Sequence, residues 1–323
     1  MNGPGCLLRQ GMRRASMLSL LLSWAVVVPF LFVACSDDSA ERAAKERRER
    51  FVADSLALKI AVTPTLDCLP LFVADEYGMF EDEGLSVRLR TYQAQMDQDT
   101  AMQQGRVEAM TTDLVRAEYL RRCGFPLRYV AVTPLHWQLV SNPIARIRQL
   151  SQLDDKMMAM TRHSATAMYS DMAIDSASLL PERVFRIQVN DVAVRLSMLL
   201  TGVMDAMWLP EPQATAARLV GSPVVDDSQM RNMSMGVIAF SEAALADSTR
   251  RQQMESFVEV YNMACDTIAH YGLQHFSSLV SERCSVAPNV ADSLTLTIPF
   301  LHAAPPRQSD IDKARAWLDK DLR

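Results

Sequence analysis

The stretch Gly105-Arg106-Val107-Glu108-Ala109-Met110 recurs as Gly202-Val203-Met204-Asp205-Ala206-Met207, at an offset of 97 residues (202 − 105 = 97). The segments Lys59-Ile60-Ala61-Val62-Thr63 and Lys156-Met157-Met158-Ala159-Met160-Thr161 open apolar runs at the same offset. In the first pair, glycine ends a helix because it tolerates a positive φ, and an apolar strand follows. A unit of about 100 residues has the size of a domain rather than of a solenoid repeat. Either short apolar motifs recur by chance, or two similar α/β lobes face each other across a cleft.

Outward from these stretches, short apolar runs alternate with helical patterns. Strands are predicted at residues 58–63, 85–91, 107–111 and 127–132, and again at 157–161, 184–189 and 205–209. This alternation of strands and helices predicts an α/β fold in which each lobe is a mostly parallel sheet flanked by helices. A further strand at 236–240 is expected to return to the first lobe, and a long helix is expected at 248–271.

The pattern predicts a first lobe made of residues 58–135 and 236–323 and a second lobe made of residues 136–235. The C-terminal helix, near residues 309–318, is expected to pack on the first lobe. Two connections then cross between the lobes, near residues 134–141 and 233–238. Such a two-segment hinge would open and close the cleft through small φ/ψ changes.

The N-terminus has the pattern of a bacterial export signal over residues 1–34. Arg9, Arg13 and Arg14 precede a stretch without charge from residue 15 to residue 34. This stretch ends in Phe32-Val33-Ala34-Cys35, which resembles a lipobox, so Cys35 is the expected site of lipidation. The alternative is a single transmembrane anchor, because about 20 uncharged residues can span a bilayer. Residues 35–57 are charged, have no apolar face, and are predicted to be a tether.

Composition places the chain among globular proteins, with 49% hydrophobic and 22% charged residues in 323 positions. The net charge of −5 argues against nucleic acid as a partner. Four cysteines follow Cys35 and, in an oxidising compartment, they either form disulfides or remain buried thiols: Cys68, Cys123, Cys265 and Cys284.

Sequence signatures of catalysis are missing. The chain has no G-x-S-x-G, H-E-x-x-H, P-loop, G-x-G-x-x-G or C-x-x-C motif, and its histidines lack zinc-ligand spacing. His163 lies beside Ser164, but neighbours at the start of a helix rarely meet as base and nucleophile. We therefore expect no catalytic residue, no metal and no cofactor.

Candidate ligand-binding residues follow the predicted strands, because ligands of parallel α/β sheets bind beyond the carboxyl ends of the strands. Hydroxyls, charges and one indole there provide the candidates: Thr65, Asp67, Thr112, Asp113, Arg162, Ser164, Thr166, Trp208 and Glu211. His136 and Trp137, near the first crossing, are weaker ones.

Each candidate also has a structural interpretation. The hydroxyls can cap helices, the carboxylates can cap helices or form hinge salt bridges, and Arg162 can lie on the solvated surface. Trp208 can stack on a flat ligand or pack in the core of its lobe. Taken as ligand groups, the acidic candidates and Trp208 favour a nitrogen-rich heterocycle over a sulfonate.

Motifs in both predicted lobes resemble those of ABC-transporter substrate-binding proteins for sulfonates, nitrate or the thiamine pyrimidine precursor. The first lobe contributes Lys59-Ile60-Ala61-Val62, Leu71-Phe72-Val73-Ala74, Tyr77-Gly78-Met79-Phe80 and Gly84-Leu85. The second contributes Leu153-Asp154-Asp155-Lys156, Ser164-Ala165-Thr166, Gly202-Val203-Met204-Asp205-Ala206 and Pro210-Glu211-Pro212. Asp155 replaces a glycine of the family pattern, and Asp67-Cys68-Leu69-Pro70 differs from the usual loop, so the resemblance does not carry over a ligand.

The resemblance implies a type II periplasmic-binding fold and a lipoprotein of the bacterial cell envelope, facing the periplasm or the cell surface. Such a protein clamps a small organic solute, for example a thiamine precursor or a sulfonate, and delivers it to a permease and its ATPase. Ligand binding would shift the equilibrium between open and closed forms. Two alternatives remain: an enzyme of the thiamine-pyrimidine synthase type, which shares this fold, and a ligand-sensing module for a membrane partner.

Overall fold

The structure, a computed structural model, describes residues 39–49, 52 and 54–321. The predicted signal segment, the lipobox with Cys35 and the alternative membrane anchor lie outside the described residues. The chain divides into two compact units, residues 1–56 and residues 57–323, and each is described by itself.

In the first unit, residues 39–49 form a helix whose side chains are all exposed. Lys45 and Glu49 pair across one helical turn at 3.9 Å, a contact worth only a few tenths of a kcal/mol at an exposed site. Over residues 39–49 the helix has no buried face. Within the described part of the chain, no helix is both long enough and apolar enough to span a bilayer.

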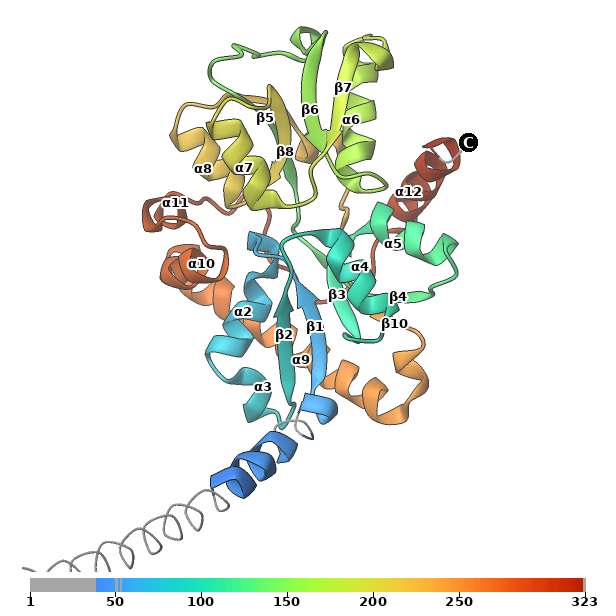
Figure 1. Ribbon diagram of the computed structural model, residues 1–323, viewed down its shortest axis with the longest axis vertical. Coiled ribbons are helices and arrows are strands. Elements are labelled where there is room, and N and C mark those ends of the chain that lie inside the picture. The colour runs from blue at the N-terminus through green and yellow to red at the C-terminus, as the bar shows by residue number, and fades with distance from the viewer. Residues whose placement is uncertain (1–38, 50–51, 53, 322–323) are drawn as a thin grey trace, which may run out of the picture. The chain divides into compact units, whose positions relative to one another are not determined.

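The second unit contains two five-stranded sheets (Figure 1). The first has the order β2-β1-β3-β10-β4 and consists of β1 (Leu58–Val62), β2 (Val87–Thr91), β3 (Ala109–Asp113), β4 (Leu127–Thr133) and β10 (Gly236–Ser241). The second has the order β7-β6-β8-β5-β9 and consists of β5 (Trp137–Ser141), β6 (Lys156–Met160), β7 (Val184–Gln188), β8 (Ala206–Pro210) and β9 (Val224–Asp227). We call each sheet with its helices the first and the second lobe.

The predicted fold class is confirmed. In the first sheet, β1 is parallel to β2 and β3, and in the second sheet β6 is parallel to β7 and β8. Each sheet also takes one antiparallel strand that enters from the other lobe. As predicted, β10 returns to the first sheet, where it pairs with β3 and β4. In the second sheet, β5 pairs with β8 and β9.

The offset of 97 residues recurs in the structure. Strands β2 and β7 begin at Val87 and Val184, and strands β3 and β8 begin at Ala109 and Ala206. Helices α4 (Gln95–Gln103) and α7 (Val192–Leu200) begin at the same offset. The glycines that follow these helices, Gly105 and Gly202, have φ values of 65° and 75°, which explains why both copies carry glycine there.

The other helices cover the faces of the sheets. They are α2 (Leu69–Glu76), α3 (Met79–Asp82), α5 (Leu114–Arg122), α6 (Ala165–Ser176), α8 (Gln213–Leu219), α9 (Ser248–Tyr271), α10 (Ser277–Arg283), α11 (Pro288–Asp292) and α12 (Gln308–Asp321). Short 3-10 helices occupy Leu66–Cys68, Leu150–Leu153, Pro181–Arg183, Ser228–Arg231, Ala244–Ala246 and Leu273–Phe276. In the first lobe, α2 and α9 pack together over one buried cluster that includes Phe72, Phe240 and Phe257.

Two predictions need correction. Residues 137–141 are not only a connection between lobes: they form β5, which lies between β8 and β9. Helix α12 does not pack on the first lobe alone, because it contacts both α5 and α6 (Figure 1). On the α5 side, Arg315 Nε donates to Glu118 Oε2 at 2.8 Å, and on the α6 side Trp317 Nε1 donates to Asp171 Oδ2 at 2.9 Å. Helix α12 therefore ties the two lobes together.

The four cysteines of the second unit are free thiols. Cys68, Cys265 and Cys284 are buried, and Cys123 is exposed. The structure therefore corresponds to the alternative of unpaired thiols at these positions.

Gly236, the first residue of β10, lies so close to Thr133 of β4 and to Leu135 that it leaves no room for a side chain. A Cβ at this position would overlap Thr133 Oγ1 and the Cβ of Leu135. We expect Gly236→Ala to lower the unfolding free energy by about 3 kcal/mol, since overpacking of this kind typically costs ~1–3 kcal/mol. The control is Gly105→Ala, whose Cβ would meet nothing within 4 Å and which should cost about 1 kcal/mol through its positive φ. Urea unfolding of both variants measures the difference, and an equal loss would contradict the steric explanation.

Candidate ligand-binding site

A narrow cavity lies where the strand ends of the two lobes face each other, and we call it the cleft cavity. It is lined by Thr63, Thr65, Asp67, Gln93, Gln95, Thr111, Thr112, Leu135, Trp137, Thr161, Asn190, Val192 and Arg195. Its free volume is about 10 Å³, which is roughly the room that one water molecule needs. The residues come from both sheets, so any solute held here would be enclosed by both lobes.

Contacts between the lobes keep the cleft cavity small. The amide of Leu66 donates to Glu211 O at 2.8 Å, and Gln213 Nε2 donates to Pro64 O at 2.9 Å. On another side, Ala94 and Asp191 form an antiparallel bridge. These two residues precede α4 and α7, so they are also equivalent under the offset of 97 residues. A solute of more than a few atoms can enter only when these contacts separate.

Arg195 is the main charge of the cleft cavity. Its side chain is 1% exposed, and burial lowers its pKa to about 10, so it remains a cation at neutral pH. The guanidinium donates to Val189 O at 2.6 Å, to Trp208 O at 3.0 Å and to Thr161 Oγ1. All three acceptors are uncharged, and no carboxylate among the described residues forms an ion pair with Arg195. A buried cation with only neutral partners is costly unless an anion joins it.

Two further polar groups of the cleft cavity have no hydrogen-bond partner among the described residues. They are the indole Nε1 of Trp137 and the hydroxyl Oγ1 of Thr112. Both residues are buried, with 4% and 2% exposure, and the guanidinium of Arg195 lies 5.9 Å from the centre of the Trp137 ring. Unsatisfied buried donors cost about 1–3 kcal/mol each. An acceptor-rich ligand in the cavity would remove this cost.

Asp67 is the one carboxyl group that lines the cleft cavity. Its oxygens accept from Thr65 Oγ1 at 2.6 Å and from Thr133 Oγ1 at 3.0 Å. Burial raises the pKa of Asp67, while these two hydroxyls act against that rise. Both carboxyl oxygens already have partners from the first lobe. The cavity therefore combines one unneutralised cation with one hydrogen-bonded carboxyl.

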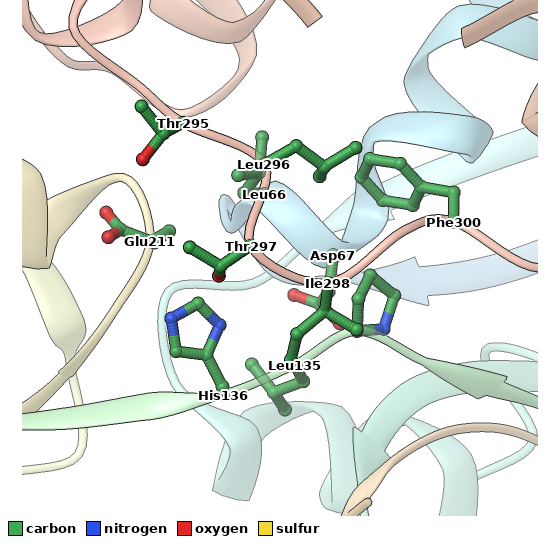
Figure 2. A pocket seen from close by; sticks show the side chains of 11 residues that line it. Leu66, Asp67, Leu135, His136, Glu211, Thr295, Leu296, Thr297, Ile298 and Phe300 are labelled. Carbon is green, nitrogen blue, oxygen red and sulfur yellow. The ribbon is translucent and has the colours of Figure 1, made fainter. Parts of the chain in front are cut away.

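A second small cavity adjoins the first on the other side of Asp67 and Leu135, and we call it the loop-side cavity. Figure 2 shows Glu211 from the end of β8, His136 from the connection before β5 and Thr297 from the segment after α11 around it. Its free volume is about 20 Å³. Glu211 is engaged by the start of α8, where it accepts from the amide and hydroxyl of Thr215 at 3.0 and 2.8 Å. It also pairs with Arg218 at 2.8 Å.

Asp113, Ser164 and Thr166 meet at the interface of the lobes but outside the cleft cavity. Asp113 Oδ1 caps its own helix α5 by accepting from the Arg116 amide at 2.9 Å, and also accepts from the Ala165 amide of the second lobe at 3.0 Å. Ser164 caps α6, since its Oγ accepts from the Thr166 amide. The Thr166 hydroxyl accepts from the Thr161 amide at 2.9 Å. The Asp113 cap therefore joins the two lobes, whereas the contacts of Ser164 and Thr166 lie within the second lobe.

The other two predicted ligand residues lie elsewhere. Trp208 is fully buried in the second lobe, where its Nε1 donates to Ser170 Oγ at 3.0 Å and its ring lies 5.5 Å from that of Tyr169. Arg162 is exposed and lines a surface groove beside α12. Of the nine predicted ligand residues, the structure brings Thr65, Asp67 and Thr112 together in the cleft cavity and places Asp67 and Glu211 in the loop-side cavity.

Sequence reasoning missed Arg195, Gln93, Gln95 and Asn190. Arg195 had a detectable signal, because it stands three residues after Val192 and four before Leu199, both buried on the same face of α7. An arginine at a core position of an amphipathic helix needs a partner inside the protein. The residue at the equivalent position of α4 is Gln98, which is fully buried and has no partner for its amide among the described residues.

The pair of Asp99 and Arg116 leads to a pH prediction. Arg116 Nε donates to Asp99 Oδ2 at 2.6 Å and its Nη1 donates to Arg162 O of the second lobe at 2.9 Å. Burial raises the pKa of Asp99 to about 6 although Arg116 opposes the rise. Between pH 4 and 6 the folded state therefore binds more protons at this site than the unfolded state, and stability falls as pH rises.

We expect the unfolding free energy of the wild type, relative to Asp99→Asn, to fall by on the order of 2–3 kcal/mol between pH 4 and 6 and then to level off. Asparagine has the same shape but does not titrate, so other ionisable groups cancel in the difference. Urea unfolding at pH 4, 5, 6 and 7 provides the measurement. A difference that is constant, or that grows in favour of the wild type, would contradict the assignment.

Several solved structures have a fold similar to that of this chain. The alkanesulfonate-binding protein SsuA from Xanthomonas axonopodis pv. citri, bound to MOPS, matches with a TM-score of 0.71 at 15% identity, over 82% of this chain and 92% of that one. The periplasmic nitrate-binding protein NrtA from Synechocystis PCC 6803 matches with a TM-score of 0.63 at 11% identity, over 79% and 74%. A DSZB mutant in complex with biphenyl-2-sulfinic acid matches at 0.58 and 16%, over 82% and 92%.

Two facing α/β lobes with a cleft between their strand ends define the two-lobed fold of periplasmic binding proteins. Residues 53–272, more than half of the chain, match the model of the NMT1-like family, and the chain belongs to this family. A comparison with curated protein sequences found no match. The identities to the solved structures are low, so those structures establish the fold, whereas the family membership supports a solute-binding role.

Proposed function

We propose that the protein is the solute-binding subunit of an ABC importer and that its cleft takes a small organic anion with an oxygen-rich head group, such as a sulfonate. The observation that carries the proposal is Arg195 at the cleft cavity, a buried cation whose side-chain hydrogen bonds all go to neutral acceptors and whose charge only Asp191 favours, without an ion-pair contact. The unpartnered indole of Trp137 and hydroxyl of Thr112 add donors beside it. The three similar structures are an alkanesulfonate-binding protein, a nitrate-binding protein and a complex with a sulfinic acid, and each of these ligands is an oxyanion when ionised.

A nitrogen-rich heterocycle is less well supported by this geometry. The acidic candidates that favoured it, Asp113 and Glu211, are engaged by helix N-termini and by an arginine. Trp208, the expected stacking platform, is in the core. Asp67 remains as an acceptor, but both its oxygens accept hydroxyl hydrogen bonds already.

Among the described residues near the cleft, the three that could serve as a nucleophile or base are engaged in other contacts. Cys68 adjoins the site, but burial raises its thiol pKa to about 12, and its Sγ contacts only hydroxyls. Ser164 is engaged as a helix cap, and His163 points to Asp321 with Nδ1 and Oδ2 2.9 Å apart. These contacts support a binding role over a catalytic one.

A thermal-shift screen tests the ligand class. The protein from residue 36 onward contains the whole compact unit 57–323 and can be purified without a lipid. Alkanesulfonates and related oxyanions should raise the unfolding temperature in a concentration-dependent way, because a ligand that binds only the folded state stabilises it. Aminopyrimidines should shift it less. A shift with aminopyrimidines alone would reject the anion proposal and leave the fold unaffected.

We further propose that lipid on Cys35 holds the protein at the bacterial envelope and that a permease recognises the closed form. The supports are the lipobox-like sequence and the charged tether over residues 35–57. Metabolic labelling with a fatty acid should mark the wild type but not Cys35→Ser. Labelling of both proteins, or of neither, would reject lipidation at this residue. The partner subunits are to be sought by co-purification in the presence of the ligand found in the screen.

A further inference from the structure

We propose that the second unit holds another ligand site, distinct from the cleft, for a small and mainly apolar molecule. It is a cavity between the two connections that join the lobes, and we call it the hinge cavity. It is lined by residues 132–136 of the first connection, by residues 228, 229, 233 and 234 of the second, and by residues 298, 299, 301, 302, 304, 305 and 307 of the segment that precedes α12. Its free volume is about 300 Å³, at the lower end of the ~300–1,000 Å³ typical of small-molecule sites.

The walls of the hinge cavity are fixed to one another by hydrogen bonds. The Trp137 amide donates to Ser228 Oγ at 2.8 Å, which joins the two connections. Gln229 Nε2 donates to Thr297 Oγ1 at 2.7 Å, and Arg307 Nη2 donates to Asn232 O at 3.1 Å. The Val132 amide donates to Ala304 O at 2.9 Å. Because these hydrogen bonds already order the walls, the cavity is preformed, and binding does not cost the conformational entropy of ordering them.

Apolar side chains surround the hinge cavity without being buried. Leu135, Met233 and Ile298 are only partly buried, and Leu301 is 65% exposed. Large apolar groups left accessible around one concavity mark an interaction site more often than scattered ones do. The chemistry of these walls fits an aromatic or alicyclic body rather than a charged one.

Polar side chains at the rim already have partners within the protein. Arg307 Nε donates to Asp310 Oδ2 at 2.8 Å, and His302 Nε2 lies 2.7 Å from Asp266 Oδ1. His136 stands at the boundary with the loop-side cavity and offers a hydrogen-bonding ring nitrogen. The expected ligand is therefore uncharged, mainly apolar, and has one polar group. Because it would contact both connections, it would also bear on the movement that opens the cleft.

A neutral fluorescent probe, N-phenyl-1-naphthylamine, tests the hinge cavity in the protein from residue 36 onward. We expect saturable binding of one equivalent with enhanced emission. Met233→Ser should weaken the affinity at least fivefold, because Met233 lines the cavity. Met230→Ser is the matched control: Met230 is 85% exposed and does not line the cavity, so its removal should leave the affinity unchanged.

Two further variants keep the test decisive. Ala304→Trp places a large side chain in the cavity and should abolish binding of the probe. It tests the site independently of Met233→Ser, in case that variant does not fold. Arg195→Gln removes the cation of the cleft and should leave probe binding intact, whatever the ligand of the cleft proves to be. Binding that does not saturate, that is lost in Arg195→Gln, or that responds equally to Met230→Ser and Met233→Ser would overturn the proposal.

Discussion

Arg195→Gln is expected to weaken the binding of an alkanesulfonate at least 100-fold. The guanidinium lies in a cavity from which water is nearly excluded, and it has no carboxylate partner among the described residues. Truncating one member of a buried, hydrogen-bonded charge pair costs about 2–5 kcal/mol, and 2.7 kcal/mol corresponds to a factor of about 100. Isothermal titration calorimetry of the wild type and the variant with the best ligand of the thermal-shift screen measures the effect.

Two controls separate the charge of Arg195 from its structural role. Arg195 also connects the ends of β6, β7 and β8 through Thr161, Val189 and Trp208, so the variant must be shown to be folded by its urea unfolding curve. Arg195→Lys keeps the charge but not the planar donors and should lose less affinity than the glutamine variant. Arg88→Gln removes an exposed arginine of β2 and should have no effect. A folded Arg195→Gln protein that binds as tightly as the wild type would reject the anion site.

The two lobes are held together by contacts that do not need a ligand. Asp113 accepts an amide of the second lobe, Arg116 donates to a carbonyl there, and α12 contacts both α5 and α6. The burial of the Arg195 charge, of Trp137 Nε1 and of Thr112 Oγ1 opposes these contacts, because burying such groups without an ion or hydrogen-bond partner costs free energy. An anion would remove that opposing cost only when the cleft is shut around it. Ligand binding and closure would thus be coupled through the same residues.

The fold could be predicted from local patterns because the repeat fixes equivalent elements. Gly105 and Gly202 mark two helix ends whose positive φ favours glycine, and each is followed by a strand that begins with Ala-Met and is buried throughout. Strand β5 could not be recognised in the same way. Trp137–Ser141 lies between β8 and β9, so its partners are distant in sequence, and a connection between lobes that also serves as a strand has no local signal.

The candidate site could be predicted only in part. The ends of the strands indicate where in the fold a ligand binds, but they do not indicate toward which side each side chain points. All five residues of β8 are buried, so the sequence does not say whether Trp208 faces the cleft or the core. Helix caps add a second ambiguity. Asp and Ser side chains can accept a hydrogen bond from a ligand or from a backbone amide at the start of a helix, and Asp113 and Ser164 do the latter. Arg195 was overlooked although its position on the apolar face of α7 distinguishes it from a surface arginine.

Trp208→Ala is expected to lower the unfolding free energy by about 3–5 kcal/mol, the range for removing a fully buried aromatic side chain. The indole is fully buried in β8, between β5 and β6, and its Nε1 donates to Ser170 Oγ at 3.0 Å. Removing it leaves a cavity against Tyr169 and takes one of two hydrogen bonds from the Ser170 hydroxyl, which still donates to Thr166 O at 2.7 Å. Urea unfolding followed by circular dichroism measures the loss without depending on tryptophan emission.

The same variant decides between the two interpretations of Trp208. If the ring is a core residue, the folded fraction of Trp208→Ala keeps its affinity for the cleft ligand, and Trp208→Phe recovers much of the stability. Ser170→Ala, which removes only the hydrogen-bond partner, should cost about 1–3 kcal/mol because it leaves a buried donor unpaired. A Trp208→Ala protein that unfolds like the wild type but no longer binds the cleft ligand would show that the ring contacts the ligand. The ligand site would then lie at β8 and not at the cleft cavity described above.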